Sequence, residues 1–303
     1  AGFAPLGEVE QLRSWQRSAV LKLSTAAGTL YLKATPPMFQ HEHRLNLFLE
    51  RCFPHHAPRT VAHDEERGWS ITRDIAGPLL IDVPDFDAWL ASYRRYAELQ
   101  IALLPRTEDL LELGVPQRPL AERTALIAPM IEDDELLLLD REGGLSRAEA
   151  RTLREAIPQL TGGWRMLSQS TAPLALDHGD LWPANMAIRD GNTVFFDWSD
   201  CALTHPFLCF ILSGPEASDA FSEIADAAER VRNAYLRPWR AWSDAWDVDA
   251  DFELVWKVGQ LHYAMMYAYD ILPNIHPRWE LERMVPFYLR LVLQRLDTPA
   301  LTG

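Results

Sequence analysis

Among the side chains with acid or amide oxygens in residues 176–200, three stand at positions that could do chemistry: Asp180, Asn185 and Asp197. Oxygen atoms of this kind are the ligands that hard cations such as Mg²⁺ prefer. A carboxylate can also orient a hydroxyl group and accept its proton. The residue types therefore indicate a magnesium site combined with a group that orients a hydroxyl.

A predicted hairpin would bring these side chains together. Pro183 stops any helix before Asn185. Residues 186–188 and 193–196 have the composition of short strands, and an Asp-Gly pair between them is a turn signal. Such a hairpin returns Asp197 to the end at which it starts. For any one of these polar residues alone, a role in making turns is the better interpretation.

The N-terminal region is predicted to supply a lysine and a carboxylate. Lys33 stands late in the last of three expected strands, which cover residues 9–13, 19–24 and 29–34. Glu42 lies on the apolar side of a helix expected over residues 38–52. A carboxylate on a buried face needs a partner, and Lys33 is the nearest candidate. The alternative is that Glu42 lies at the edge of the apolar stripe and is hydrated.

The remaining chain is predicted to be mostly helical. A hairpin over residues 61–72 ends at a break with Gly77 and Pro78, which we interpret as the boundary between a lobe of residues 1–76 and a lobe of residues 77–303. Ser146 and Glu149 form a capping-box pattern at the start of one helix. The expected helices cover residues 86–104, 120–131, 147–167, 204–213, 217–242, 252–272 and 279–296.

Composition limits the partners and the compartment. The chain has 303 residues and a net charge of −14, which argues against nucleic acid and is consistent with a cationic substrate, although acidity can serve solubility alone. No apolar run approaches the ~20 residues that span a bilayer, so no membrane partner is expected. The start of the chain lacks a secretory pattern, and three cysteines without metal spacing fit a reducing cytoplasm.

These features together carry a resemblance. With Lys33, Glu42, the break at 73–77, and HGDLWPAN followed by FFDWSD, the sequence resembles the aminoglycoside phosphotransferase family over about residues 9–296. These are small-molecule kinases with the protein-kinase-like fold. The resemblance implies an α+β protein of two lobes: an N-terminal antiparallel sheet plus one helix, and a larger, mostly helical C-terminal lobe.

The resemblance also implies roles in the catalytic loop. Asp180 would be the catalytic base, or would at least orient the substrate hydroxyl. Asn185 and Asp197 would hold Mg²⁺ on the phosphates of ATP or GTP. His178 would brace the loop. This division agrees with phosphoryl transfer, which asks a protein mainly for positioning and charge neutralisation.

In the N-terminal lobe, the resemblance implies a nucleotide site. Lys33 would hold the α- and β-phosphates and would itself be kept in place by Glu42. The backbone of Arg73 and Ile75 would meet the adenine.

One departure from the family pattern keeps alternatives open. A glycine-rich G-x-G-x-x-G is missing between the first two strands, where residues 14–18 form the turn. A catalytically inactive kinase-like protein that binds nucleotide or ligand is therefore an alternative. A metal-dependent hydrolase with His178, Asp180 and Asp197 as ligands is another. Asp200 is expected to cap the segment that follows it.

The C-terminal helices would grip the acceptor. They offer acidic and aromatic side chains, namely Glu216, Asp219, Asp270, Trp239, Tyr263 and Tyr267. This set suits a cationic amine such as an aminoglycoside, or choline held by cation–π contact, and suits a sugar or an amino alcohol equally. The net charge favours an amino-bearing molecule.

Overall fold

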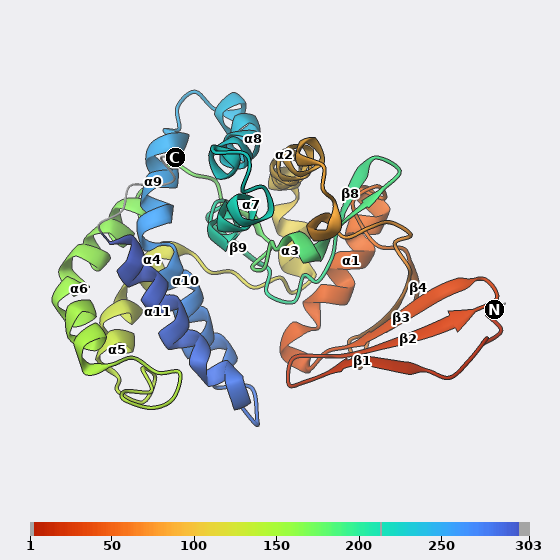
Figure 1. Cartoon of the computed structure of the whole chain (residues 1–303), viewed down its shortest axis with the longest axis horizontal. Helices are drawn as coiled ribbons and strands as arrows, with labels where there is room; N and C mark the ends of the chain where they lie inside the picture. Colours follow the sequence, from red (N-terminus) through yellow and green to blue (C-terminus); the bar gives the residue numbers. More distant parts are fainter. Residues whose placement is uncertain (1–2, 213, 297–303) are drawn as a thin grey trace.

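The N-terminal part of the protein is an antiparallel sheet of five strands in the order β1-β2-β3-β5-β4, with the helix α1 beside it (Figure 1). The computed structural model describes residues 3–212 and 214–296. The elements of this lobe are β1 Glu10–Ser14, β2 Ala19–Thr25, β3 Gly28–Ala34, α1 His41–Cys52, β4 Thr60–Asp64 and β5 Trp69–Arg73. The strands and the helix predicted for this region are confirmed, except that residues 37–39 form a 3₁₀ turn before α1.

The sheet places Lys33 in its middle. In the strand β3, Lys33 is paired with Val20 of β2 on one side and with Ser70 of β5 on the other. Residues two apart in a strand share a face, so Tyr31 and Lys33 point to the same side of the sheet. That side faces the helical lobe across a cleft, since both residues line it.

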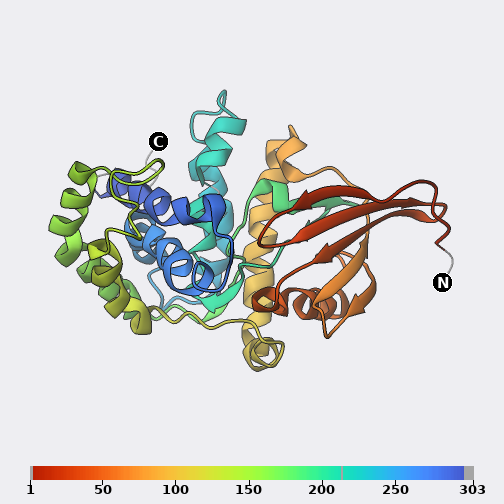
Figure 2. The ribbon, with the colours of Figure 1, turned by 90° about the horizontal axis from the view of Figure 1, so that it is seen from below.

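The C-terminal lobe is mostly helical and lies on the other side of the molecule from the sheet (Figure 2). Its α-helices include α2 Phe86–Leu103, α3 Thr107–Glu112, α4 Leu120–Arg123, α5 Ile127–Glu132, α6 Arg147–Ser168, α7 Gly214–Ala220, α8 Ala227–Trp242, α9 Val248–Val258, α10 Gln260–Met265 and α11 Met284–Arg295. The α+β, two-lobe fold class predicted from the sequence is confirmed.

Two small sheets flank the loop of residues 178–185, which carries Asp180 and Asn185. One pairs β6 Ala175–Asp177 with β9 Ala202–Thr204, and the other pairs β7 Met186–Arg189 with β8 Asn192–Phe195. The hairpin β7–β8 was predicted, whereas β6 was not. None of the helices that the structure describes has the length and apolar character required to cross a membrane.

Side-chain caps start two of the long helices. The Asp85 carboxylate accepts hydrogen bonds from the amides of Asp87 and Ala88 at the start of α2. Ser146 and Glu149 form the predicted capping box at the start of α6. Each cap satisfies amides that would otherwise lack a partner in the first turn of the helix.

The helix predicted over residues 204–213 is wrong. Residues 202–204 form the strand β9, because their backbone pairs with β6, and only the 3₁₀ turn Cys209–Leu212 follows. Residue 213 lies outside the described residues. The apolar run in this segment reflects burial on all sides, which periodicity cannot distinguish from a helix.

Other predicted helices are interrupted. The helix over 217–242 is two helices, α7 and α8, because Phe221 between them is buried edge-on against Phe86 and Trp89. The helix over 252–272 breaks at Gly259 and ends in the π-helix Met266–Ile271. Short 3₁₀ turns at residues 124–126 and 279–283 interrupt or open the helices predicted over 120–131 and 279–296.

Candidate active site

The loop after β6 is shaped by a glycine. Gly179 has a φ of +77°, and a Cβ at this position would lie 2.3 Å from the carbonyl oxygen of Asp200. Only glycine meets both demands, because other residues are strained at positive φ and would collide with the neighbouring backbone. The next residue, Asp180, is therefore presented from a tightly packed turn.

The hairpin β7–β8 returns the chain beside this loop. Its turn is formed by Asp190 and Gly191, with φ values of +51° and +72°, as expected for a tight hairpin turn. After the hairpin, the Phe196 amide donates to the Asn185 carbonyl at 3.1 Å. Asp197 follows with a φ of +65°, a left-handed conformation that is uncommon outside glycine and often marks a functional site.

Asp180 and Asn185 are in direct contact. The Asn185 Nδ2 donates to the Asp180 carboxylate oxygen Oδ2 at 3.0 Å and to the Asp180 carbonyl at 2.8 Å. Both donors of the amide therefore face Asp180. The Asn185 Oδ1 remains as an acceptor, which fits a role as an oxygen ligand for a cation.

Lys33 joins the two lobes at the site. Its Nζ lies 2.6 Å from Glu42, 2.6 Å from Asp197 and 3.0 Å from the Ser199 hydroxyl. Ser199 in turn donates to Glu42 at 3.1 Å. The predicted pair of Lys33 with Glu42 is confirmed, and Glu42 is buried as the apolar-face pattern indicated.

The charges of these groups follow from their surroundings. Burial alone would raise the pKa of Asp197, but the charge and hydrogen bond of Lys33 outweigh it and hold this pKa well below its usual range. Burial and the charges of Asp200 and Asp197 raise the pKa of Asp180 to about 7. A carboxyl with a pKa near neutral pH is well matched to accept a proton.

His178 is a structural residue. Burial lowers its pKa to about 4, so the ring is neutral near pH 7. Its Nε2 donates to the Phe196 carbonyl at 3.0 Å, which ties the catalytic loop to the segment before Asp197. The prediction that His178 braces the loop is confirmed. Among the described residues no group of three or more His, Cys, Asp or Glu side chains is arranged to hold a metal ion, so the hydrolase site with His178, Asp180 and Asp197 as ligands is not supported.

A cleft of about 510 Å³ lies between the sheet and the hairpin. Among its lining residues are Lys33, Glu42, Arg73, Ile75 and Asp197. Asp180 and Asn185 are not among the lining residues, although Ala184 next to Asn185 is. The structure therefore brings Lys33, Glu42 and Asp197 together at the cleft, and the Asp180–Asn185 pair lies close enough for the Asp197 charge to act on Asp180.

Arg17, which sequence reasoning did not assign, meets Asp200 and Tyr267 at the site. Arg17, from the turn between β1 and β2, forms an ion pair with Asp200 and donates to the Tyr267 hydroxyl at 3.0 Å. The expectation that Asp200 caps the following segment is wrong, because its carboxylate is used by Arg17. The sequence signal that could have indicated this contact is Arg17 itself, which stands in the turn where the family pattern has glycines.

Several acceptor-binding residues suggested by the sequence are unsuited to that role. Trp239 and Tyr263 are fully buried, since they pack in the core of the helical lobe. Asp270 is neutralised by Arg118 at 2.9 Å and by Arg123 at 3.2 Å. The two buried aromatic residues and Asp270, whose carboxylate is occupied by two arginines, are therefore not available to bind a cation.

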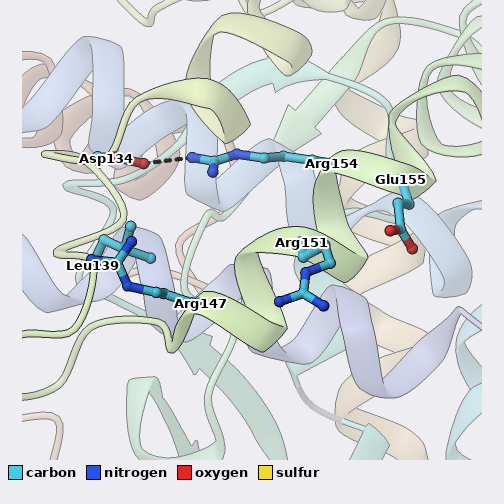
Figure 3. Close-up of a pocket in the computed structure, with 6 residues that line it drawn as sticks. All are labelled: Asp134, Leu139, Arg147, Arg151, Arg154 and Glu155. Atoms are coloured by element: carbon cyan, nitrogen blue, oxygen red, sulfur yellow. Dashed lines mark hydrogen bonds and ion pairs between the residues drawn. The ribbon is translucent and has the colours of Figure 1, made fainter.

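A second hollow, of about 530 Å³, lies on the surface at the start of α6, away from the cleft (Figure 3). Its arginines are largely compensated. Arg154 pairs with Asp134 at 2.6 Å, and Arg147 pairs with Asp140 at 2.7 Å. We assign this hollow no part in the active site.

A sheet lobe with a lysine–carboxylate pair, facing a helical lobe with an Asp–Asn loop, defines a kinase-type phosphotransferase. The sequence profile of the phosphotransferase enzyme family matches residues 8–252. The chain belongs to this family, which includes the aminoglycoside phosphotransferases, and it is a small-molecule kinase. No curated protein gives a significant match to the chain.

Solved structures share the fold. A choline/ethanolamine kinase family protein from Mesorhizobium loti has a TM-score of 0.57 and 17% identity, covering 98% of this chain and 90% of its own. Choline kinase from Cryptosporidium parvum has a TM-score of 0.62 and 12% identity, covering 95% and 88%. Spectinomycin phosphotransferase, in complex with ADP and spectinomycin, has a TM-score of 0.54 and 10% identity, covering 94% and 92%.

Proposed function

We propose that this kinase transfers the γ-phosphoryl group of ATP or GTP to a hydroxyl of an amino-bearing small molecule of aminoglycoside or choline type. The observation that carries the proposal is that Lys33 contacts Asp197 at the cleft, while the Asp180–Asn185 pair lies near enough for the Asp197 charge to act on Asp180. A cation for phosphate, oxygen ligands for a metal and a carboxylate for a hydroxyl are the parts that phosphoryl transfer needs.

The nucleotide lies in the cleft, with its base at the connection after β5. The amides of Arg73 and Asp74 already donate to the carbonyls of Arg59 at 2.8 Å and Thr29 at 3.0 Å. The Ile75 amide, next in the chain and lining the cleft, is therefore the backbone donor that we assign to the adenine. Arg73 lines the cleft beside Ile75, and its backbone is the second contact that we assign to the adenine. Lys33 binds the α- and β-phosphates, positioned by Glu42.

Asn185 and Asp197 hold the nucleotide-bound Mg²⁺. The donor set fits this ion, because one amide oxygen and one ionised carboxylate are hard ligands that leave further positions for phosphate oxygens and water. When bound, Mg²⁺ neutralises charge on the phosphates. Removal of divalent cations with a chelator is expected to abolish turnover, and added Mg²⁺ is expected to restore it.

Asp180 acts on the acceptor. Its carboxylate orients the hydroxyl and takes the proton as the hydroxyl oxygen forms a bond to the γ-phosphorus. At the same time the bond from that phosphorus to the bridging oxygen of the nucleotide breaks, and the nucleoside diphosphate leaves. The hydrogen bond from Asn185 fixes the orientation of the Asp180 carboxylate. The carboxylate is therefore already positioned to contact the acceptor hydroxyl when the acceptor binds.

The acceptor contacts the helical lobe. We also propose that residues 1–76 and 77–303 act as the nucleotide lobe and the catalytic, acceptor-binding lobe. The net charge of −14 favours a cationic acceptor. The acids Glu216 and Asp219 on α7 remain candidates to contact it, since neither is neutralised by an ion pair in the described structure. Relatives named as choline/ethanolamine kinases and a spectinomycin phosphotransferase support an amino-bearing acceptor.

The experiment that tests this function is a screen of ATP and GTP consumption with aminoglycosides, choline, homoserine and small sugars. We expect turnover above the hydrolysis background with at least one amino-bearing compound, and none with the same compound lacking its hydroxyl. Phosphorylation of neutral sugars alone would refute the amino-bearing acceptor. Nucleotide binding without turnover on any compound would favour an inactive binding protein.

A further inference from the structure

The turn between β1 and β2 takes the place of a glycine-rich loop but is built differently. Two hydrogen bonds close it: the Trp15 amide donates to the Ser18 carbonyl at 3.1 Å, and the Trp15 indole Nε1 donates to the Ser18 hydroxyl at 3.0 Å. The guanidinium of Arg13 stacks on the Trp15 ring at 3.7 Å. The bonds between Trp15 and Ser18 therefore fix this turn, with Arg13 lying over the Trp15 ring, whereas glycines would leave the backbone open to a ligand.

Arg17 reaches from this turn to the helical lobe. Its Nη1 donates to the Tyr267 hydroxyl at 3.0 Å, and its Nη2 pairs with the Asp200 carboxylate. Only 7% of the residue is exposed. A buried guanidinium requires charged or hydrogen-bonded partners, so its position is set by residues of the other lobe.

The guanidinium of Arg17 lies next to the residues that we assign to the reaction. Asp200 stands three positions after Asp197, and its carbonyl lies against Gly179, the residue before Asp180. Arg118 also holds that carbonyl, at 3.1 Å. The guanidinium thus lies beside the catalytic loop and the end of the hairpin, close enough for its charge to act on both Asp180 and Asp197. In the proposed function, the transferred phosphoryl group passes between these two carboxylates.

The same turn has unused hydrogen-bonding capacity. In the part of the chain that the structure describes, the side-chain nitrogen and oxygen of Gln16 are both buried, and neither has a hydrogen-bond partner. Buried polar groups without partners are rare in native proteins. The Gln16 amide, next to Arg17 in the chain, is therefore free to bond to a polar ligand that completes the site.

We propose that Arg17 binds the transferred phosphoryl group, in place of the glycine-rich loop that the chain lacks. This proposal rests on the proposed function. A guanidinium has five N–H donors in a planar fork, and the described contacts of Arg17 use one on Nη1 and one on Nη2, so three donors remain for phosphate oxygens. It stabilises the charge of the phosphoryl group while the bond to the acceptor oxygen forms and the bond to the nucleotide breaks. Asp200 and Tyr267 are positioning residues that hold the fork.

Nucleotide discrimination tests the proposal without any acceptor. The affinities for Mg-ADP and for the non-hydrolysable analogue Mg-AMP-PNP are measured by calorimetry for the wild type and for Arg17→Met. Loss of charge-assisted hydrogen bonds to the γ-phosphate is expected to weaken AMP-PNP binding by about tenfold or more. ADP binding is expected to stay unchanged, and turnover to fall by about a hundredfold. Arg17→Lys, which keeps the charge without the fork, should be intermediate.

Arg13→Met is the matched control. It removes the same charge from the end of β1, next to the turn, but Arg13 is exposed and stacks on Trp15. We expect it to keep the wild-type ratio of the two affinities. An equal loss in this variant would show a general effect of charge and would overturn the specific role of Arg17.

Two further outcomes separate the explanations. Arg17→Met leaves Asp200 buried without its cation, which can destabilise the fold; the double variant Arg17→Met/Asp200→Asn removes both charges and should show the same loss of AMP-PNP preference. An unchanged preference, or faster turnover, would overturn the proposal. A wild-type protein that binds neither nucleotide would instead refute the proposed function itself.

Discussion

The ammonium nitrogen of Lys33 lies 2.6 Å from a carboxylate oxygen of Glu42 and 2.6 Å from one of Asp197. Glu42 belongs to the same lobe, whereas Asp197 ends the hairpin of the other lobe, 164 positions later in the chain. A single cation therefore connects the sheet, the helix α1 and the catalytic loop. This contact organises the cleft before any nucleotide enters it.

Replacing Lys33 by Met tests this connection. The variant leaves Glu42 and Asp197 without their shared cation and removes the charge that we assign to the nucleotide phosphates. We expect kcat/KM for the nucleotide to fall by about 10²–10³, as for the loss of one electrostatic contact to the transition state. Steady-state kinetics at varied Mg-ATP measures this.

Lys22→Met is the control for that variant. Lys22 lies on β2, and its ion-pair partner within residues 3–212 and 214–296 is the exposed Glu10, at 3.5 Å. Surface pairs contribute ~0–1 kcal/mol, so wild-type kinetics are expected. Similar losses in the two variants would show that the position of Lys33 is not special.

The shape of the catalytic loop depends on Gly179. In Gly179→Ala the added methyl would lie 2.3 Å from the Asp200 carbonyl, at a φ of +77°. We expect the free energy of unfolding to fall by about 1–3 kcal/mol, the cost of such strain, together with a loss of turnover.

Gly162→Ala, inside α6, is the control for this variant. Nothing lies within 4 Å of the new methyl, and we expect the free energy of unfolding to rise by up to ~1 kcal/mol. Urea unfolding of both variants distinguishes a local conformational demand from a general intolerance of alanine.

The pH dependence of stability carries the signature of a buried histidine. Burial, assisted by the charge of Arg118, lowers the pKa of His41 to about 4, and its Nε2 donates to the Ser199 carbonyl at 3.1 Å. The unfolded chain, with a histidine pKa of about 6.5, binds this proton first as the pH falls. The neutral His41 therefore stabilises the fold above pH ~6.5 and loses that advantage below it.

The variant His41→Gln removes this titration while keeping a donor for the carbonyl. Relative to the wild type, its free energy of unfolding is expected to rise by about 1.4 kcal/mol per pH unit below pH ~6.5. Asp177 and Asp180, whose pKa values burial raises to about 7, shift both proteins in the same way, so the difference isolates His41. A constant difference between pH 7.5 and pH 5 would contradict this assignment.

Local signals predicted the parts of the site that lie close together in sequence. The Asp-Gly turn and two short apolar runs indicated the hairpin that returns Asp197 to Asn185, and the apolar face of α1 indicated a buried Glu42. In each case one backbone element of known periodicity sets the distance between the residues. The resemblance to the family then joined the two halves across the cleft.

Contacts between distant elements were not predictable in this way. The pairing of Arg17 with Asp200 joins positions 183 residues apart, and no local rule relates them. Trp239 illustrates the converse error: an aromatic side chain on a predicted substrate-binding helix is fully buried in the core. Helical periodicity identifies an apolar face but does not say whether a ligand or another helix covers it.

The role of Asp180 as the group that acts on the acceptor hydroxyl is the central claim. We expect Asp180→Asn to lower the rate of phosphoryl transfer by about 10²–10⁴, the contribution of a general base, and to leave the affinity for Mg-ATP within about twofold of the wild type. The same change at Asp190, in the exposed hairpin turn, should alter neither. The decisive measurement is single-turnover transfer of the γ-phosphoryl group to the best acceptor from the screen: near-complete loss in Asp180→Asn with nucleotide bound supports the account, and wild-type transfer by this variant would contradict it.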